Sequence, residues 1–340
     1  MTEFPELLRK VVRGENLSRA EADRAIGAFF DAQVTPAQAG ALLAALATKG
    51  ETAEEIAGAA AAMRARAIHV EHGLPTVIDV CGTGGDHSGT INISTCAAFV
   101  IAGCGVAVAK HGNRAATSKC GSADVLEALG IALDAGPIEA ARQLREHHVA
   151  FLFAQYYHPA AKNVGPVRRE LGIHTLFNLL GPLSNPASVT RQVIGVANES
   201  HLMIVAGALR ELGAEAGAVI HASNGLDEIA GDVPTRVYQF DAKAAYGWIL
   251  DPSDYRINAP MSSVAGGDAA FNAQFMLELF RGEHPEAADI VALNAALALV
   301  VAGAAGDMWE AIEKARSSIN KGAALAALDA LRKPRELEVV

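Results

Sequence analysis

Residues 77–95 read VIDVCGTGGDHSGTINIST, and this stretch decides the expected fold. Val77–Val80 predicts a short strand, a glycine-rich turn follows at 81–86, and residues 90–95 open a helix that Ser94 is expected to cap. Glycines allow positive φ and close approach to a bulky anion, and a helix N-terminus favours phosphate. The turn is equally consistent with a simple change of chain direction, and it lacks both the GxGxxG spacing and the GK[ST] ending of known nucleotide motifs.

Downstream of this stretch, short apolar runs alternate with helical stretches. The runs lie at 106–109, 149–153, 193–196 and 216–220. This alternation predicts βα units around a mostly parallel sheet flanked by helices, an α/β fold. A later pair of runs, 236–240 and 246–250, predicts a hairpin or a sheet edge, and the chain then returns to helices, including 271–281 and 285–304.

The first seventy residues have a different, all-helical pattern. Three capping boxes predict helix starts, formed by Ser18 with Glu21, Thr35 with Gln38 and Thr52 with Glu55; Gly50 and Gly73 are expected helix stops. We therefore expect a small α-helical domain at 1–73, which forms a dimer interface completed by helices near 165–185, and a larger α/β domain at 74–340. Apolar helical faces on so short a segment favour a two-fold dimer.

A second polar loop follows the run at 106–109. It reads KHGNRAATSKCGS from Lys110 to Ser122 and places three cations and several hydroxyl groups in a short stretch. Because ligands bind at the carboxyl ends of the strands in open α/β sheets, this loop and the glycine turn should face one cleft. A solvated surface loop is the alternative, but the flanking strand and the helix start at 121–124 favour a binding site.

The composition excludes several classes of protein. The formal net charge of −10 disfavours nucleic-acid and anionic-membrane partners. The four cysteines form no CxxC pair, so we expect buried free thiols and no zinc site. The longest apolar run, 290–305, is interrupted by Asn294 and is shorter than a bilayer requires, so it predicts a buried core helix. With no signal peptide at the start of the sequence, these features predict a cytoplasmic protein.

Four ordered stretches resemble the signatures of the anthranilate phosphoribosyltransferases. They are 79–95, 110–130, 172–186 (GIHTLFNLLGPLSNP) and the NGLDE loop at 224–228. The resemblance spans most of the chain, and the helical first seventy residues match the small α domain of that family. It implies transfer of a phosphoribosyl group from phosphoribosyl diphosphate (PRPP) to the amine of anthranilate in tryptophan biosynthesis, with diphosphate released.

The resemblance also implies a set of binding residues. The PRPP site comprises Gly82, Gly85, Asp86, Thr90, Asn92, Ile93, Ser94, Thr95, Lys110, His111, Gly112, Asn113, Arg114, Ala115, Ala116, Thr117, Ser118 and Ser122. Anthranilate is expected to contact Gly82, His111, Asn113, His158 and Arg168. Arg168 matches the family's anthranilate-binding arginine, and its planar guanidinium suits a benzoate carboxylate, whereas Arg169 is interpreted as a helix-surface residue.

Mg²⁺ is the expected cofactor, with two ions per subunit held in part by Ser94, Asp227 and Glu228. Adjacent carboxylates on a loop suit this hard cation, although acids at a helix N-terminus would give the same pattern. The sequence departs from the family at His174, where arginine is frequent, at Cys120, where serine is common, and at 221–224 before the acidic pair.

No catalytic base is assigned, because a neutral aromatic amine is already nucleophilic. Catalysis is expected from positioning and from stabilising the departing diphosphate, with Lys110, Arg114 and Lys119 supplying positive charge beside Mg²⁺. Two alternatives remain: a pyrimidine-nucleoside phosphorylase-like enzyme, whose Lys-His-Ser-type loop differs from Lys110–Gly112, and a non-enzymatic nucleic-acid-binding relative of the same fold, which should be basic and lack an intact metal loop.

Overall fold

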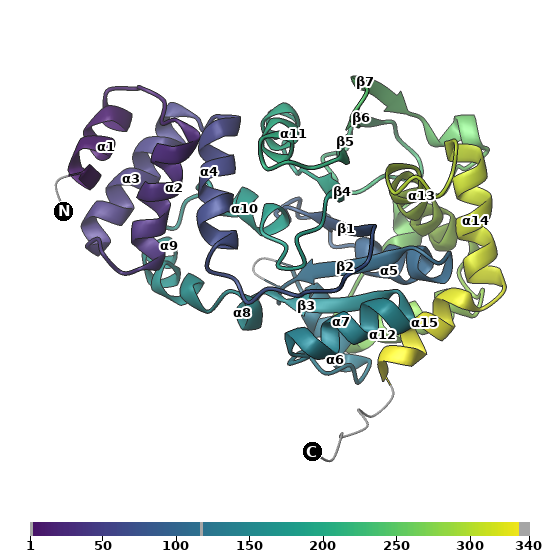
Figure 1. Cartoon of the computed structure of the whole chain (residues 1–340). Coiled ribbons are helices and arrows are strands. Elements are labelled where there is room, and N and C mark those ends of the chain that lie inside the picture. The colour runs from purple at the N-terminus through teal and green to yellow at the C-terminus, as the bar shows by residue number, and fades with distance from the viewer. Residues whose placement is uncertain (1–2, 116–117, 333–340) are drawn as a thin grey trace, which may run out of the picture.

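The computed structural model describes residues 3–115 and 118–332. Its centre is a seven-stranded sheet in the order β3-β2-β1-β4-β5-β6-β7 (Figure 1). The strands are β1 Val77–Gly82, β2 Ala107–Gly112, β3 Val149–Phe153, β4 Arg191–Gly195, β5 Ala216–Ala222, β6 Thr235–Phe240 and β7 Ala245–Leu250. The first five are parallel, whereas β6 and β7 are antiparallel and form one edge, so the predicted α/β sheet with a terminal hairpin is confirmed.

The alternation of side chains along the strands divides the core between the two faces of the sheet. Ile78 and Val80 of β1 face the largest apolar cluster, which contains α5 and the C-terminal helices, whereas Val77 faces the opposite side. The helices that follow the first strand are α5 Ile93–Gly103, α6 Ser122–Ala128, α7 Pro137–His147, α8 Ala154–Tyr157, α9 Gly165–Leu171, α10 Phe177–Leu183, α11 His201–Glu211, α12 Ala269–Phe280, α13 Pro285–Val301, α14 Met308–Asn320 and α15 Ala323–Arg332. Short 3₁₀ turns lie at Pro159–Asn163, Pro252–Tyr255 and Met261–Val264.

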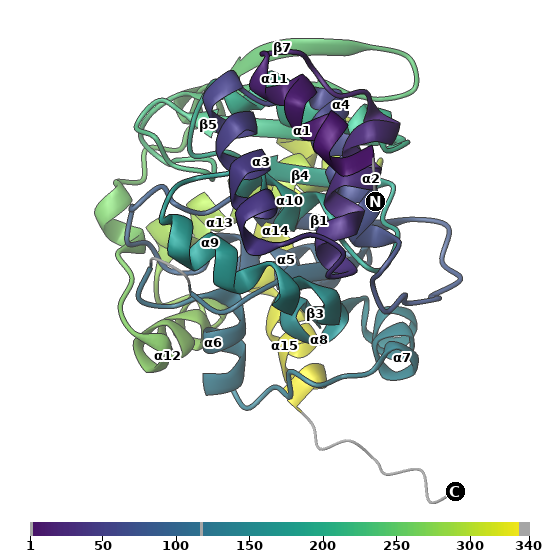
Figure 2. The ribbon, with the colours of Figure 1, turned by 90° about the vertical axis from the view of Figure 1, so that its left-hand side faces the viewer.

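Four helices form a separate bundle in front of the sheet (Figure 2). They are α1 Glu3–Val12, α2 Arg19–Phe30, α3 Pro36–Lys49 and α4 Ala53–Arg64. All three predicted capping boxes form, since the side chains of Ser18, Thr35 and Thr52 each accept the amide three residues on. Apolar residues of α9, α10 and α11 share the core of this bundle, which therefore continues onto one face of the sheet.

Two sequence expectations about helix ends are wrong. Gly73 does not stop a helix, because α4 already ends at Arg64, and Arg66 just beyond it turns back to pair with Asp31. Ser94 does not cap α5: the helix begins at Ile93, so Ser94 lies within its first turn and its amide donates to Glu228 instead. The expected stop at Gly50 does hold, as the C-cap of α3.

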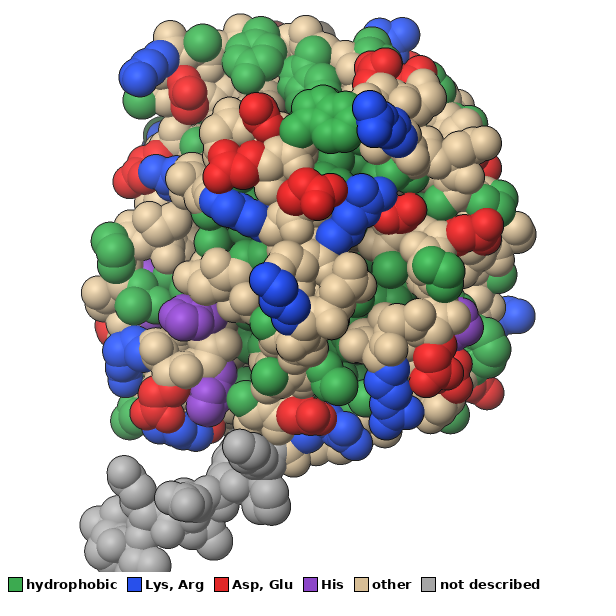
Figure 3. Space-filling model, turned by 90° about the vertical axis from the view of Figure 1, so that its right-hand side faces the viewer, with side chains coloured by type: hydrophobic (Ala, Val, Ile, Leu, Met, Phe, Trp, Pro, Cys, Tyr) green, Lys and Arg blue, Asp and Glu red, His purple; other side chains and the backbone are tan. Residues whose placement is uncertain are grey.

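The face formed by the C-terminal helices carries acidic and basic side chains interspersed among scattered apolar ones (Figure 3). Helix α13 is the buried helix predicted from the apolar run at 290–305, and it is buried along most of its length. Among the described residues, no single helix is long and apolar enough to cross a membrane, although α12 and α13, bent by 88° at their junction, pass such a test as a pair.

Candidate active site

A cavity of about 690 Å³ opens at the carboxyl ends of β1 and β2. It lies where the strand order changes direction, since β2 and β4 flank β1 on opposite sides. This switch point is the usual ligand site in open α/β sheets. The described residues predicted for PRPP, anthranilate and metal all line it: Gly82, Gly85, Asp86, Thr90, Asn92, Ile93, Ser94, Thr95, Lys110, His111, Gly112, Asn113, Arg114, Ala115, Ser118, Ser122, His158, Arg168, Asp227 and Glu228. The predicted contacts Ala116 and Thr117 lie outside the described residues.

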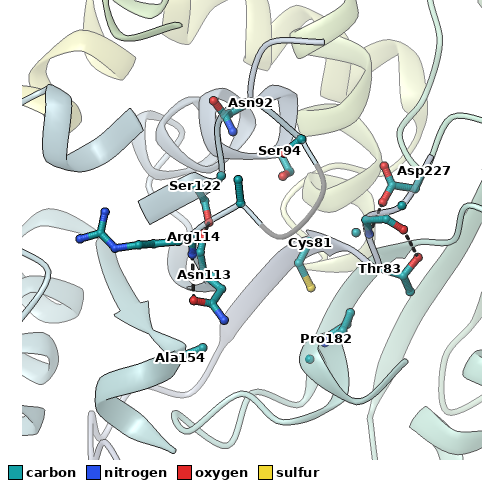
Figure 4. A pocket seen from close by; sticks show the side chains of 18 of the residues that line it. Cys81, Thr83, Asn92, Ser94, Asn113, Arg114, Ser122, Ala154, Pro182 and Asp227 are labelled. Carbon is teal, nitrogen blue, oxygen red and sulfur yellow. Dashed lines mark hydrogen bonds between the residues drawn. The ribbon is translucent and has the colours of Figure 1, made fainter. Parts of the chain in front are cut away.

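Asp227 is hydrogen-bonded to the glycine turn. Its carboxylate accepts the Gly84 amide at 2.7 Å, and Figure 4 shows it beside Thr83 at one wall of the cavity. Its main chain lies directly on the end of β4, where a Cβ on Gly195 would overlap it. The loop at 224–228 is therefore seated on the strand ends, and only a glycine at 195 allows this close approach.

Glu228 and Lys110 meet at the start of α5. The Glu228 carboxylate accepts the Ser94 amide at 3.1 Å, and Lys110 Nζ donates to the Val80 carbonyl at 2.7 Å and contacts Ser94 Oγ at 3.3 Å. Burial raises the pKa of Glu228, and repulsion from Asp227 raises it further, while Lys110 acts in the opposite direction. Burial, with repulsion from Asp86, likewise raises the pKa of Asp227.

This arrangement fits a divalent cation. Two carboxylates whose pKa values are raised by burial and by repulsion between acids are stabilised by a nearby positive charge. The part of the chain that the structure describes contains no cluster of three or more His, Cys, Asp or Glu side chains suited to a metal. A pair of carboxylates is sufficient for Mg²⁺, which keeps several waters and shares substrate phosphate oxygens.

Asp79 ties the end of β2 to the loop at 184–187, although sequence reasoning did not assign it. It is fully buried in β1, where its carboxylate accepts the His111 amide at 3.2 Å and Asn185 Nδ2 at 2.8 Å. Asn185 also donates to the Ala109 carbonyl at 2.7 Å. One carboxylate thus joins β1, the end of β2 and the 184–187 loop; an acidic residue inside an apolar strand was the available signal.

The basic loop is held partly by acids of the following helix. Arg114 pairs with Asp124 at 2.9 Å and with Glu127 at 2.8 Å, and in Figure 4 its side chain points away from Cys81 and Asp227. The Asp124 carboxylate also accepts the amides of Ala115 and Gly121. Lys110 therefore contacts Ser94, whose amide binds Glu228, whereas Arg114 pairs with two acids of α6.

Two buried histidines also line the cavity. The His111 and His158 rings meet edge to face with their centroids 5.1 Å apart. His111 Nδ1 donates to the Gly181 carbonyl at 3.0 Å; its Nε2 and both His158 nitrogens have no hydrogen-bond partner among the described residues. Burial lowers the pKa of His111 to about 3 and that of His158 to about 4, so both rings are neutral at pH 7.

Arg168 lines the cavity from α9. Its guanidinium stands over the Phe177 ring, 5.4 Å from the centroid, and makes no ion pair with a described carboxylate. A guanidinium held by an aromatic face, with free donors, is suited to clamp a planar carboxylate. The neighbouring Arg169 is not among the lining residues.

Sequence reasoning missed several other lining residues. Phe30, Met63, Phe177 and Pro182 bring apolar surface from the helical bundle and α10, and Gly266 and Gly267 arrive from a distant loop. Gly266 N donates to the Gly89 carbonyl at 2.8 Å, so this loop closes the back of the glycine turn. Single apolar residues and glycines carry no local signal, because only the tertiary fold brings them together.

The fold and the cavity define a two-part transferase, and comparison with known proteins agrees. Residues 5–67 match the family model for the glycosyl transferase family, helical bundle domain, and residues 74–325 match the model for the glycosyl transferase family, a/b domain. Anthranilate phosphoribosyltransferases of Rhodopseudomonas palustris strain BisA53 and Xanthobacter autotrophicus are each 46% identical to this chain, covering 96% and 97% of it and 97% and 96% of their own lengths.

Solved structures give the same result. The anthranilate phosphoribosyltransferase of Thermus thermophilus is 41% identical with a TM-score of 0.90, covering 96% of this chain and 98% of its own. That of Saccharomyces cerevisiae in complex with PRPP and Mg is 27% identical with a TM-score of 0.87, covering 96% of both chains. The chain belongs to the anthranilate phosphoribosyltransferase family. These relatives do not support the phosphorylase or nucleic-acid-binding alternatives.

Proposed function

We propose that this cavity transfers the phosphoribosyl group of PRPP to the amine of anthranilate, giving N-(5-phosphoribosyl)anthranilate and diphosphate, a step of tryptophan biosynthesis. The observation that supports the proposal is one cavity whose lining combines a glycine turn, a lysine and two carboxylates with two neutral histidines and an arginine that has no ion pair among the described residues. We assign the glycine turn, Lys110, Ser94, Asp227 and Glu228 to a donor end, and His111, Asn113, His158 and Arg168 to an acceptor end. The relatives supply the substrate names, since one yeast structure contains PRPP and Mg and another contains 4-fluoroanthranilate.

At the donor end, backbone amides and Lys110 would bind the phosphate groups. The predicted PRPP contacts, Gly82, Gly85, Asp86, Thr90, Asn92–Thr95, Lys110–Ser118 and Ser122, surround this space where described. Ser94, Asp227 and Glu228 would hold Mg²⁺, and the ion would supply positive charge for the leaving diphosphate. Two ions per subunit is the proposed number. Fixed positive charge in a partly buried site favours departure of the anion.

At the acceptor end, Arg168 would clamp the anthranilate carboxylate, and Gly82, His111, Asn113 and His158 would place the amine towards the ribose. Gln155 Nε2 donates to Asn113 Oδ1 at 3.3 Å, which fixes the direction of that amide. The amine attacks in its neutral form, so positioning of the two substrates supplies most of the catalysis and no general base is assigned.

A fluorescence assay tests the proposal directly. When purified protein is mixed with PRPP, Mg²⁺ and anthranilate, the fluorescence of anthranilate should decrease as it is converted. Omission of either PRPP or Mg²⁺ should prevent this decrease. Turnover of a pyrimidine nucleoside with free phosphate, with anthranilate left intact, would contradict it.

We also propose the assembly and location of the protein. The helical part, 1–73 with helices near 165–185, would mediate a homodimer, while 74–340 would carry the substrates. Two exposed apolar side chains support this: Val12 on α1 is 67% exposed, and Ile173, which follows α9, is 51% exposed. A monomeric mass in light scattering at micromolar concentration would contradict it. Four free cysteines favour a reducing, cytoplasmic location.

A further inference from the structure

Asn294 is the polar residue that interrupts the apolar helix α13. Its side chain is buried, with 6% of its surface exposed, and its neighbours along the helix from Ile290 to Leu299 are fully buried. A helix that only filled the core would be served by leucine at this position. A buried amide in such surroundings is stable only when its hydrogen bonds are made.

The Asn294 side-chain amide makes two hydrogen bonds to the main chain of Ile229. Oδ1 accepts the Ile229 amide at 2.9 Å, and Nδ2 donates to the Ile229 carbonyl at 2.9 Å. Nδ2 also donates to the Ile290 carbonyl, one turn earlier in α13, at 2.9 Å. The side chain therefore pairs with Ile229 as a neighbouring strand would, and it is itself fixed by its own helix.

Ile229 directly follows Asp227 and Glu228, in a segment without regular secondary structure. Residues 226–230 are buried or half-buried but belong to no helix or strand, so their backbone groups have no repeating partners. Asn294 supplies these partners from one side. From the other side, Gly84 and Ser94 donate their amides to the Asp227 and Glu228 carboxylates.

We propose that Asn294 is a positioning residue for the cation site: it fixes the backbone after Glu228, so that the two carboxylates face Ser94 and the glycine turn in the geometry that binds Mg²⁺ with PRPP. This inference rests on the proposed function, which assigns Asp227 and Glu228 to the metal. Asn294 itself does not line the cavity and touches no substrate. Residues that orient metal ligands typically change metal affinity 10- to 100-fold when replaced.

The test measures PRPP binding by calorimetry at a series of Mg²⁺ concentrations, without anthranilate, so that no turnover occurs. Asn294→Leu preserves the bulk of the side chain but leaves the Ile229 amide and carbonyl unpaired. We expect the Mg²⁺ concentration for half-maximal PRPP binding to rise about tenfold or more. The KM for anthranilate at saturating Mg²⁺ and PRPP should change less than twofold, because the acceptor end is untouched.

Asn294→Ala separates hydrogen bonding from packing. A water in the space left by the amide restores only part of the bonding to Ile229, so the alanine variant should require less Mg²⁺ than the leucine variant but at least about threefold more than wild type. If packing were the only role of Asn294, leucine would be the milder change. Ser318→Ala is the matched control, because Ser318 is also buried and hydrogen-bonded, to the Val100 carbonyl at 2.9 Å, but lies in α14. It should lower the unfolding temperature and leave the Mg²⁺ requirement within twofold of wild type.

A folded leucine variant with the wild-type Mg²⁺ requirement, or a leucine variant milder than alanine, would overturn the inference. If the leucine variant does not fold, the alanine variant provides the test. A wild-type Mg²⁺ requirement in the alanine variant would then overturn the inference. Asp227→Asn/Glu228→Gln separates failure of the proposed metal site from failure of the proposed role of Asn294. If that variant also keeps the wild-type Mg²⁺ requirement, the proposed metal site is wrong; if it alone loses PRPP binding, only the role of Asn294 is wrong.

Discussion

At the donor end of the cavity, three charged side chains already have hydrogen-bond partners in the described part of the protein, whereas at the acceptor end a neutral histidine and an arginine do not. Asp227, Glu228 and Lys110 are bonded to Gly84, Ser94 and Val80 respectively. By contrast, both nitrogens of His158 lack a partner among the described residues, and Arg168 faces only an aromatic ring there. The donor end is thus held in place in advance for a highly charged leaving group, while the acceptor end keeps unpaired groups for one small acid to satisfy.

The largest effect should come from neutralising the donor end. In Asp227→Asn/Glu228→Gln we expect kcat/KM to fall on the order of 10³-fold, because the charge that organises Mg²⁺ and diphosphate is lost. Since burial raises the pKa of both carboxyls, their neutral replacements should not lower the unfolding temperature in metal-free buffer. Near-normal activity of this variant at limiting Mg²⁺ would contradict the assignment of Asp227 and Glu228 to the donor end.

At the acceptor end, the expected effect is smaller and confined to one substrate. Arg168→Ala should lower kcat/KM for anthranilate by roughly 30- to 150-fold, since a charge-assisted contact contributes about 2–3 kcal/mol. Arg168→Lys should restore little, because an ammonium group lacks the planar fork. Arg169→Ala is the control, as Arg169 does not line the cavity. Equal losses in Arg168→Ala and Arg169→Ala would show that the clamp is misassigned.

The two buried histidines should make the acceptor end sensitive to acid. Their folded-state pKa values, about 3 for His111 and about 4 for His158, lie below the ordinary 6.5, so the folded state binds fewer protons than the unfolded chain. The contribution of the two neutral rings to the free energy of unfolding is therefore fully present above pH 6.5, and it is lost as the pH falls towards 4. Each ring should cost about 2 kcal/mol at about pH 5.

Urea unfolding at about pH 7 and about pH 5 measures this cost. His158→Phe should lose about 2 kcal/mol less than wild type between the two pH values. His148→Asn, at an exposed position with positive φ, is the control and should follow wild type. Parallel losses in wild type and His158→Phe would mean that His158 can be protonated in the folded protein.

The smallest effect is expected at Cys120, where the resemblance to the family predicts serine more often. Cys120 Sγ contacts Asn92 Oδ1 at 3.5 Å, and Asn272 Nδ2 donates to the same oxygen at 3.1 Å. A serine hydroxyl can make the same donation, so Cys120→Ser should change the KM for PRPP less than threefold. A larger change in steady-state kinetics would indicate that the thiol sets the position of Asn92 more strictly than this network implies.

The sequence predicted the sheet and most of the cavity because those features have local signals. Strand β3 lies at 149–153, as the apolar run indicated, and the two loops that follow β1 and β2 meet because parallel strands end at the same edge. The resemblance to family motifs also predicted that Asp227 and Arg168 share one site, although they lie far apart in the sequence.

The remaining features depend on tertiary contacts. Asn294 was visible only as an interruption in an apolar run, and its partner Ile229 lies 65 residues away. The pairing of Arg114 with Asp124 and Glu127 was also missed, because charge alone does not show whether a cation faces a ligand or its own helix. Ser94 was misassigned as a cap since its amide binds a carboxylate from a distant loop, which no local pattern encodes.

Calorimetric titration of PRPP with Mg²⁺ into Arg168→Ala, without anthranilate, tests the separation of the two ends most directly. The account predicts a dissociation constant within twofold of wild type, while kcat/KM for anthranilate in the same preparation falls roughly 30-fold or more. A loss of PRPP affinity as large as the loss in kcat/KM would contradict it, because Arg168 would then belong to the donor end.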